Sequence, residues 1–129
     1  MEILFLIGRI IVGLFYLSSA LNHFQHTDMM AQYAGSKGVP APRASIIITG
    51  LMLLIGGLTI LTGFFPLIGI ALLVIFLLGT TFIMHNFWTI EDAQARQMET
   101  IQFMKDLALA GSLLMLVVID RPWPLSLNF

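Results

Sequence analysis

Long apolar segments alternate with short polar connections along the chain of 129 residues. The apolar segments cover residues 3–24, 44–62, 67–87 and 101–119. Each has close to the ~20 residues that a helix needs to cross the hydrocarbon core of a bilayer, and none alternates in polarity like a membrane β-strand. Because lipid offers no hydrogen-bond partner to the backbone, each segment must satisfy its own backbone groups. The pattern therefore predicts an all-α integral membrane protein with four transmembrane helices.

The sequence between the second and third segments predicts a very short connection. Gly63 is suited to end one helix in a left-handed conformation, and Pro66 is suited to the first turn of the next helix. These two helices should therefore form an antiparallel hairpin. No internal repeat, low-complexity tract or domain boundary is visible, so we expect one domain over residues 1–129. The predicted architecture is a four-helix bundle with up-down-up-down topology.

The two longer connections should lie on one side of the membrane, opposite both termini. Residues 25–43 predict a short interfacial helix over 29–34, and residues 88–100 predict a polar helix that leads into the fourth span. The basic residues on the side of the connections are Lys37, Arg43, Arg96 and Lys105, against Arg9 and Arg121 on the other side. The positive-inside rule therefore favours cytoplasmic connections and external termini in this multi-pass protein.

Composition agrees with a membrane location and excludes several kinds of chemistry. Hydrophobic residues make up 58% of the chain and charged residues 10%, whereas soluble domains carry about a quarter charged residues. The formal net charge of -1 offers no basic surface to nucleic acid. The absence of cysteine excludes disulfide exchange, cysteine-held iron–sulfur clusters and c-type haem attachment within the chain. No basic region precedes the first apolar segment, so we expect a retained helix and not a signal peptide.

Polar residues at the ends of three apolar segments should converge near one membrane face. In the predicted topology, the end of the first span, the end of the third span and the start of the fourth span share a side. The polar residues at these ends are Asn22, His23, His85, Asn86, Lys105 and Asp106. Ionisable side chains inside a span are costly and mark functional sites by default. We therefore predict that these residues line a polar pocket that binds a cofactor or another small molecule.

A less specific explanation competes with the pocket. Histidine and asparagine are common near the ends of spans, and Lys105 can extend its long stem to the interface. Asp106 fits this explanation least, because its side chain is too short to reach bulk water. We expect it to turn into the bundle and meet His85 first, with His23 or Asn22 next. Lys105 points about 100° away around the helix and is an awkward partner.

A metal site is a more specific alternative to the small-molecule pocket. The two histidines at the end of the first span, together with His85 and Asp106, could supply nitrogen and oxygen ligands. The spacing of two histidines is a weak signal, however, and no carboxylate–histidine motif surrounds them. We therefore predict no metal site, and the sequence assigns no catalytic residue.

Arg9 interrupts the first apolar segment on the side of the termini. By helical rise it lies roughly 10 Å from the start of the chain, shallow enough for its side chain to extend to the interface. Pairing with Asp120, which follows the fourth segment, is the alternative, and the sequence favours neither.

Several short sequences, taken in order, resemble those of one family of small bacterial membrane proteins. They are LIGRIIVGLFYLSSALNHF, YAGSKGVPAP, GLMLLIGGLTILTGFFPLIG, FLLGTTFIMHNFW and QFMKDLALAGSLLML. Together they resemble the DoxX family over nearly the entire chain. The resemblance implies a four-helix inner-membrane protein. Some relatives are subunits of a thiosulfate:quinone oxidoreductase, and others are linked to oxidative-stress and thiol-homeostasis complexes.

The polar positions of the family carry over to this chain in part. They correspond here to Arg9, Asn22, His85, Asn86 and Lys105. Family members often have lysine at the position of His23 and asparagine at the position of Asp106. The chain thus lacks one cationic side chain and gains an acidic one, so the ligand preference of a relative does not carry over directly.

The first functional hypothesis is a small subunit of a membrane-associated redox system, linked to quinones or to sulfur and thiol chemistry. A quinone fits as the cofactor because its carbonyls need hydrogen-bond donors, which His85, Asn86 and Lys105 can supply. Without cysteine chemistry of its own, the chain would be at most an accessory oxidoreductase subunit that depends on a partner redox subunit.

The alternative is a non-enzymatic structural or assembly subunit that stabilises a partner membrane protein. A solute transporter ranks below both, because the sequence has no inverted repeat and no broken helix in mid-membrane. Besides the lipid bilayer, the expected partners are a quinone or small apolar molecule and a protein subunit. Self-association into a homo-oligomer stays open.

Overall fold

The computed structural model describes residues 1–127, which contain helices and no strand. In order, the helices are α1 (Glu2–Gln25), α2 (Thr27–Ser36), α3 (Pro42–Thr62), α4 (Pro66–Met84), the 3-10 helix η1 (Phe87–Thr89) and α5 (Ala93–Leu116). The all-helical prediction is therefore confirmed. The short helix predicted in the first connection is also present, as α2.

The boundaries of the helices follow local backbone rules. Gly63 ends α3 with a φ of 76°, in the left-handed region that glycine adopts without strain. Pro66 begins α4, where its missing N–H has no helical partner to lose. The predicted tight turn between the two helices is confirmed. The third predicted segment extended to residue 87, but α4 ends at Met84 because the backbone leaves the helical conformation at His85 (φ -114°, ψ 44°).

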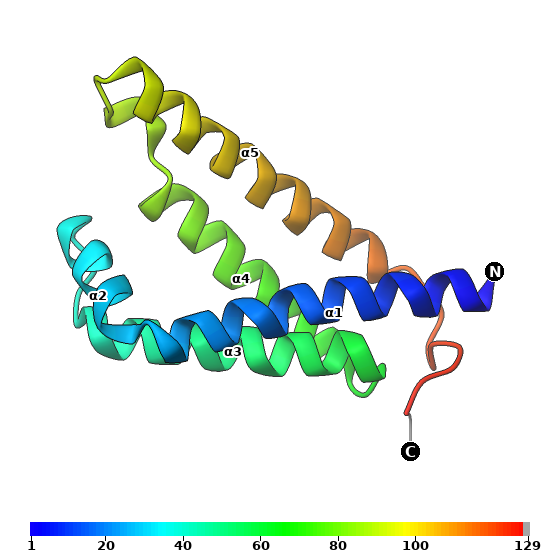
Figure 1. Ribbon diagram of the computed structural model, residues 1–129. Helices are drawn as coiled ribbons and strands as arrows, with labels where there is room; N and C mark the ends of the chain where they lie inside the picture. The colour runs from blue at the N-terminus through cyan, green and yellow to red at the C-terminus, as the bar shows by residue number, and fades with distance from the viewer. Residues whose placement is uncertain (128–129) are drawn as a thin grey trace.

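The helices form two pairs that separate toward one end of the molecule. α1 lies along α3, whereas α4 and α5 diverge together from that pair toward the end where α2 lies (Figure 1). α5 packs mainly on α4 and η1. The start of α1 and the segment that follows α5 lie at the opposite end (Figure 1).

Small residues allow close approach within the α1–α3–α4 part of the fold. A Cβ atom at Gly56 would lie 2.4 Å from the Leu73 side chain of α4, and one at Gly57 would lie 3.0 Å from the Leu17 side chain of α1. Both glycines therefore lie where two helices are in close contact. Gly111 of α5 differs, because a Cβ added there would meet nothing within 4 Å.

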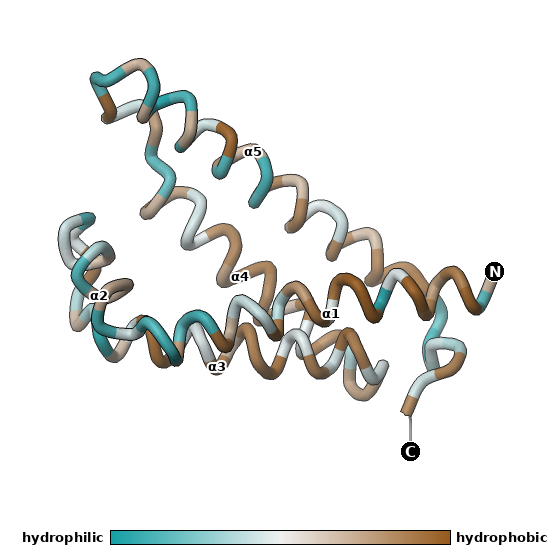
Figure 2. The backbone as a smooth tube through the Cα atoms, viewed as in Figure 1, coloured by the Kyte–Doolittle hydropathy of each residue, from teal (hydrophilic) through white to brown (hydrophobic). Residues whose placement is uncertain are grey.

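Within residues 1–127, three helices have the length and composition to cross a membrane, namely α1, α3 and the segment Pro66–Thr89 that contains α4. Figure 2 shows apolar residues along these helices and polar residues around α2 and the start of α5. Many large apolar side chains on their outer faces are exposed, as expected for surfaces that contact lipid. α5 differs because it carries Glu99 in its second turn and Lys105 and Asp106 at its middle.

Arg9 neither extends its side chain to the membrane interface nor pairs with Asp120, the two alternatives that the sequence left open. It is 3% exposed, and its guanidinium donates hydrogen bonds to backbone carbonyls of α3 and of the segment after α5. The acceptors and donor–acceptor distances are Ile60 (3.2 Å), Leu61 (3.0 Å), Pro124 (2.6 Å) and Leu125 (3.2 Å). Five N–H donors in a planar group can satisfy several carbonyls at once, which a surface position would not use. Arg9 thus fixes the C-terminal segment to the α3–α4 hairpin.

Candidate functional site

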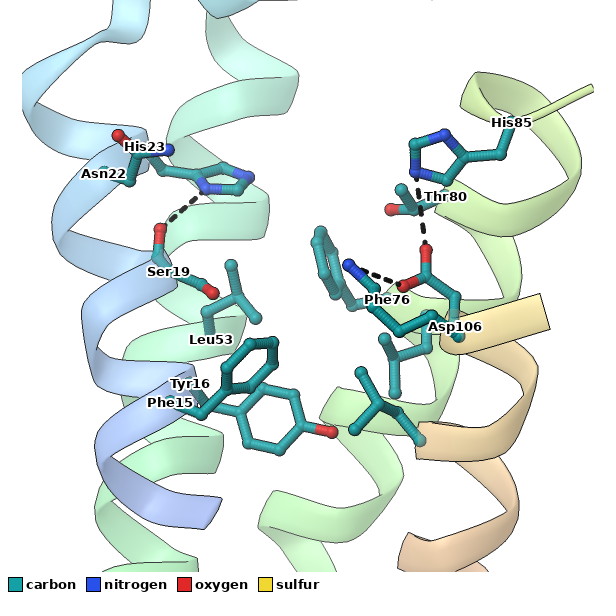
Figure 3. Close-up of a pocket in the computed structure, with 13 residues that line it drawn as sticks. Phe15, Tyr16, Ser19, Asn22, His23, Leu53, Phe76, Thr80, His85 and Asp106 are labelled. Carbon is teal, nitrogen blue, oxygen red and sulfur yellow. Dashed lines mark hydrogen bonds and ion pairs between the residues drawn. The ribbon is translucent and has the colours of Figure 1, made fainter. Parts of the chain in front are cut away.

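A polar cavity of about 170 Å³ lies between the two helix pairs. Its walls come from α1, α3, α4, α5 and the residue after α4 (Figure 3). The lining residues are Phe15, Tyr16, Ser19, Asn22, His23, Leu53, Phe76, Leu77, Thr80, His85, Lys105, Asp106 and Leu109. The structure therefore brings together five of the residues that the sequence predicted, namely Asn22, His23, His85, Lys105 and Asp106.

Asp106 and His85 form the wall contributed by α5 and the end of α4. Asp106 is 5% exposed and turns toward the cavity, where its Oδ2 lies 3.5 Å from His85 Nε2 (Figure 3). His85 is the partner expected for Asp106, and this prediction is confirmed. The backbone leaves the helical conformation at His85, and the His85 ring lies beside Glu99 and Asp106 of α5.

Lys105 contacts Asp106, although their 100° separation around the helix made this contact unexpected from the sequence. Its Nζ lies 3.6 Å from Asp106 Oδ1 and donates a hydrogen bond to Gln102 Oε1 at 2.8 Å. The long lysine stem curves back along α5, so the 100° separation of the two Cβ atoms does not keep the charges apart. Lys105 is half-exposed and lies at the rim of the cavity.

Glu99 also belongs to the group of polar side chains around His85, and the sequence did not predict it. Its Oε2 accepts a hydrogen bond from His85 Nδ1 at 2.6 Å, and its Oε1 accepts one from the Tyr33 hydroxyl at 3.3 Å. Burial, and then the neighbouring Glu99 carboxylate, raise the pKa of Tyr33. The spacing in the sequence could have revealed Glu99, because it precedes Asp106 by about two helical turns and the two residues must therefore share one face of α5.

His23 and Tyr16 supply the polar groups of the α1 wall. His23 Nδ1 lies 2.9 Å from the Ser19 carbonyl oxygen, which can only accept, so Nδ1 carries the hydrogen. The Nε2 of the neutral ring is then an acceptor, and the ring faces the cavity (Figure 3). The Tyr16 side chain is 1% exposed, and its hydroxyl has no hydrogen-bond partner within residues 1–127. An unpaired buried donor and an acceptor on the same wall of the cavity suit a bound polar group.

Asn86 is the predicted residue that does not line the cavity. Its Oδ1 accepts a hydrogen bond from Lys37 Nζ at 2.9 Å, and the residue lies between α4 and η1. This contact links the end of α2 to the α4–α5 connection. Among the described residues 1–127, no group of three histidine or carboxylate side chains is placed to share a metal ion.

Long apolar helices with a polar cavity near one end define an integral membrane protein of helical class. The DoxX family matches the chain over residues 4–86, and the chain belongs to this family. It is similar to the inner membrane protein YphA of Escherichia coli (strain K12), with 32% identity over 127 residues that cover 98% of this chain and 89% of the relative. No solved structure matches the chain. The protein is thus a multi-pass inner-membrane protein of the DoxX family.

Proposed function

We propose that the polar cavity binds the headgroup of a quinone and that the protein serves as a small subunit of a membrane redox system. The observation that carries this proposal is the pair of hydrogen-bonding groups on α1 for which residues 1–127 supply no partner. The Tyr16 hydroxyl can donate to a quinone carbonyl, and the His23 Nε2 can accept from a quinol hydroxyl. One site can therefore hold both redox forms of the same ring.

The opposite wall of the cavity adds a group that can exchange protons with such a ligand. Asp106 lies beside His85, and His85 in turn contacts Glu99, which is more exposed than Asp106. Quinone reduction takes up protons as well as electrons, and carboxylates and imidazoles are the side chains suited to deliver them. The chain has no cysteine, so its electrons would come from a partner subunit that carries the redox centre. In this account the protein is an accessory subunit of an oxidoreductase.

We also propose that α5 is a fourth span and that residues 1–129 form one up-down-up-down domain. The large apolar side chains of α5 that point away from the cavity are exposed, and they include Met98, Ile101, Met104 and Met115. Glu99 and Asp106 turn inward, toward α4 and the cavity. A helix with an apolar outer face and a polar inner face suits contact with lipid on the outside.

This topology predicts that single cysteines at Ser36 and Ala95 react with a membrane-impermeant thiol reagent from the same side in intact cells. The chain has no other cysteine, so each label reports one position. From the basic residues of the connections we expect the cytoplasmic side for both. Reaction from opposite sides would refute the fourth span, whereas reaction of both from the periplasm would reverse only the orientation.

The headgroup proposal predicts a specific effect of Tyr16→Phe. The variant should bind ubiquinone-0, a quinone headgroup without a tail, about fivefold more weakly, because one hydrogen bond is worth about 1 kcal/mol. It should melt no earlier than the parent in the absence of ligand, since the lost hydroxyl has no partner in the described chain. The measurements are equilibrium binding of radiolabelled ubiquinone-0 and thermal unfolding in mild detergent.

Ser18→Ala is the matched control for this test. It removes a hydroxyl from the exposed side of the same helix and should change neither binding nor melting. A parent protein that binds neither ubiquinone-0 nor the naphthoquinone menadione saturably would contradict the proposed function. Equal binding by Tyr16→Phe and the parent would remove the assigned role of Tyr16.

The structural or assembly subunit remains the second candidate, and the outer face of α5 favours it. The small residues Ala108, Gly111 and Ser112 lie there, exposed, and no other described helix covers them. Small residues allow a partner helix to approach closely in a membrane. If a defined membrane protein co-purifies in constant ratio while no quinone binds, this candidate replaces the redox subunit.

A further inference from the structure

A large apolar groove continues from the polar cavity between α2, α3 and α4. Its volume is about 680 Å³. His23, Phe76, Thr80 and His85 line both the groove and the polar cavity, so the two spaces share a wall and adjoin. The polar cavity alone falls below the ~300–1,000 Å³ of typical small-molecule sites, whereas the groove lies within that range. A ligand held in the polar cavity therefore has room to extend into the groove.

The chemistry of the groove suits a flexible hydrocarbon chain. Met29, Met30, Met52 and Met84 line it, half of the eight methionines in the sequence. Methionine side chains are flexible and polarisable, and they adapt to irregular apolar ligands. The hydroxyl groups of Ser45 and Thr49 also line the groove, but both donate to backbone carbonyls of their own segment, at 2.9 and 2.8 Å. They therefore do not call for a polar group in the ligand.

We propose that this groove holds the isoprenoid tail of the quinone whose headgroup occupies the polar cavity, an inference that rests on the proposed function. The charges of the cavity favour this occupant over a phospholipid. The Asp106 carboxylate turns into the cavity and takes Lys105 as a partner, so the lysine that lines the cavity is not free for a phosphate group. A neutral ring with a polyisoprenoid chain matches a polar head site whose lysine and aspartate charges compensate each other, joined to an apolar groove.

Gly79 allows the groove to be blocked without touching the headgroup site. It lines the groove but not the polar cavity, and an added Cβ would meet nothing within 4 Å. Gly79→Leu should therefore fill part of the groove, and it improves rather than weakens the helical propensity of α4. Gly111→Leu is the matched control, because Gly111 is also helical and exposed, with open space around an added Cβ, but lies on α5 outside the groove.

The test compares the binding of ubiquinone-0 and ubiquinone-4 to the parent, Gly79→Leu and Gly111→Leu proteins at one detergent concentration. Partition of the tail into micelles is then the same for all three proteins. We expect Gly79→Leu to weaken ubiquinone-4 binding at least about tenfold, because buried methylene contacts are lost. Its affinity for ubiquinone-0 should change less than twofold, and Gly111→Leu should change neither value.

The remaining outcomes separate the two proposals. If ubiquinone-0 binds but Gly79→Leu leaves ubiquinone-4 binding unchanged, the tail lies elsewhere and this inference is wrong while the headgroup site stands. If Gly79→Leu instead releases a co-purifying phospholipid and leaves quinone binding intact, a lipid chain occupies the groove and the inference is again wrong. If no quinone headgroup binds the parent protein, the proposed function fails and the inference fails with it.

Discussion

Replacing Arg9 with leucine should lower the apparent melting temperature of the protein in mild detergent by about 10 °C or more. The substitution removes a buried guanidinium that donates to four backbone carbonyls on two separate segments. Hydrogen bonds to charged groups contribute about 1.5–3 kcal/mol each, and a loss of a few kcal/mol shifts the melting of a chain of this size by that order. The segment 117–127 should also become more sensitive to protease, because two of the hydrogen bonds that tie it to the rest of the fold come from Arg9, whereas the bond from the Leu127 N–H to the Thr62 carbonyl is kept.

Two further variants make the Arg9 result specific. Arg121→Leu removes an exposed arginine that donates within its own segment, to the Val117 carbonyl, and should change the melting temperature little. Arg9→Lys keeps the charge but offers one compact ammonium in place of a planar group, so it should fall between the parent and Arg9→Leu. If Arg9→Leu melts like Arg121→Leu, the assigned structural role of Arg9 is wrong.

Replacing Asp106 with leucine should damage both stability and ligand binding, whereas asparagine should be tolerated. Leucine leaves His85 and Lys105 without the acceptor they share, which we expect to reduce stability by about 1–3 kcal/mol. Binding of ubiquinone-0 should fall by about tenfold, because the wall that positions His85 is lost. Asparagine keeps an acceptor oxygen of nearly the same shape. Thermal unfolding and equilibrium binding in detergent measure both effects.

Asp120→Leu is the control for the loss of a carboxylate, since Asp120 is exposed beyond the end of α5. It should leave binding unchanged. An Asp106→Leu protein that melts like the parent and binds ubiquinone-0 equally well would show that the cavity is not a ligand site. Equal damage by asparagine and leucine would instead indicate that the charge, and not the acceptor geometry, matters at this position.

Features that depend on local sequence were predictable. The turn at Gly63 and Pro66 follows from backbone preferences of two residues, and the helices follow from the length of the apolar runs. The inward orientation of Asp106 was predictable as well, because a short charged side chain in an apolar helix cannot reach bulk water and is costly in contact with lipid. These inferences need no knowledge of which helices pack together.

Features that depend on packing between distant segments were not predictable. Arg9 finds its acceptors more than fifty residues away, on α3 and after α5, and nothing near Arg9 in the sequence indicates these carbonyls. The sequence did not identify Tyr16 as a site residue, because a tyrosine in an apolar segment is common. Only the packing of the helices shows that its hydroxyl is buried without a hydrogen-bond partner in the described chain. Contrary to the prediction from the sequence, Asn86 does not line the cavity, because α4 ends at Met84 and the Asn86 side chain contacts Lys37 instead.

The most direct test of the central claim is to locate a bound quinone on the chain. A photoreactive azidoquinone, illuminated with the protein in lipid nanodiscs, should form adducts in peptides that contain residues 15–23 and 76–85, because these segments line the polar cavity. Excess ubiquinone-0 should suppress the adducts, and Asp106→Leu should reduce them in proportion to its lost affinity. Adducts found only on the outer, lipid-facing sides of the helices, or adducts that excess ubiquinone-0 does not suppress, would contradict a quinone site in this cavity.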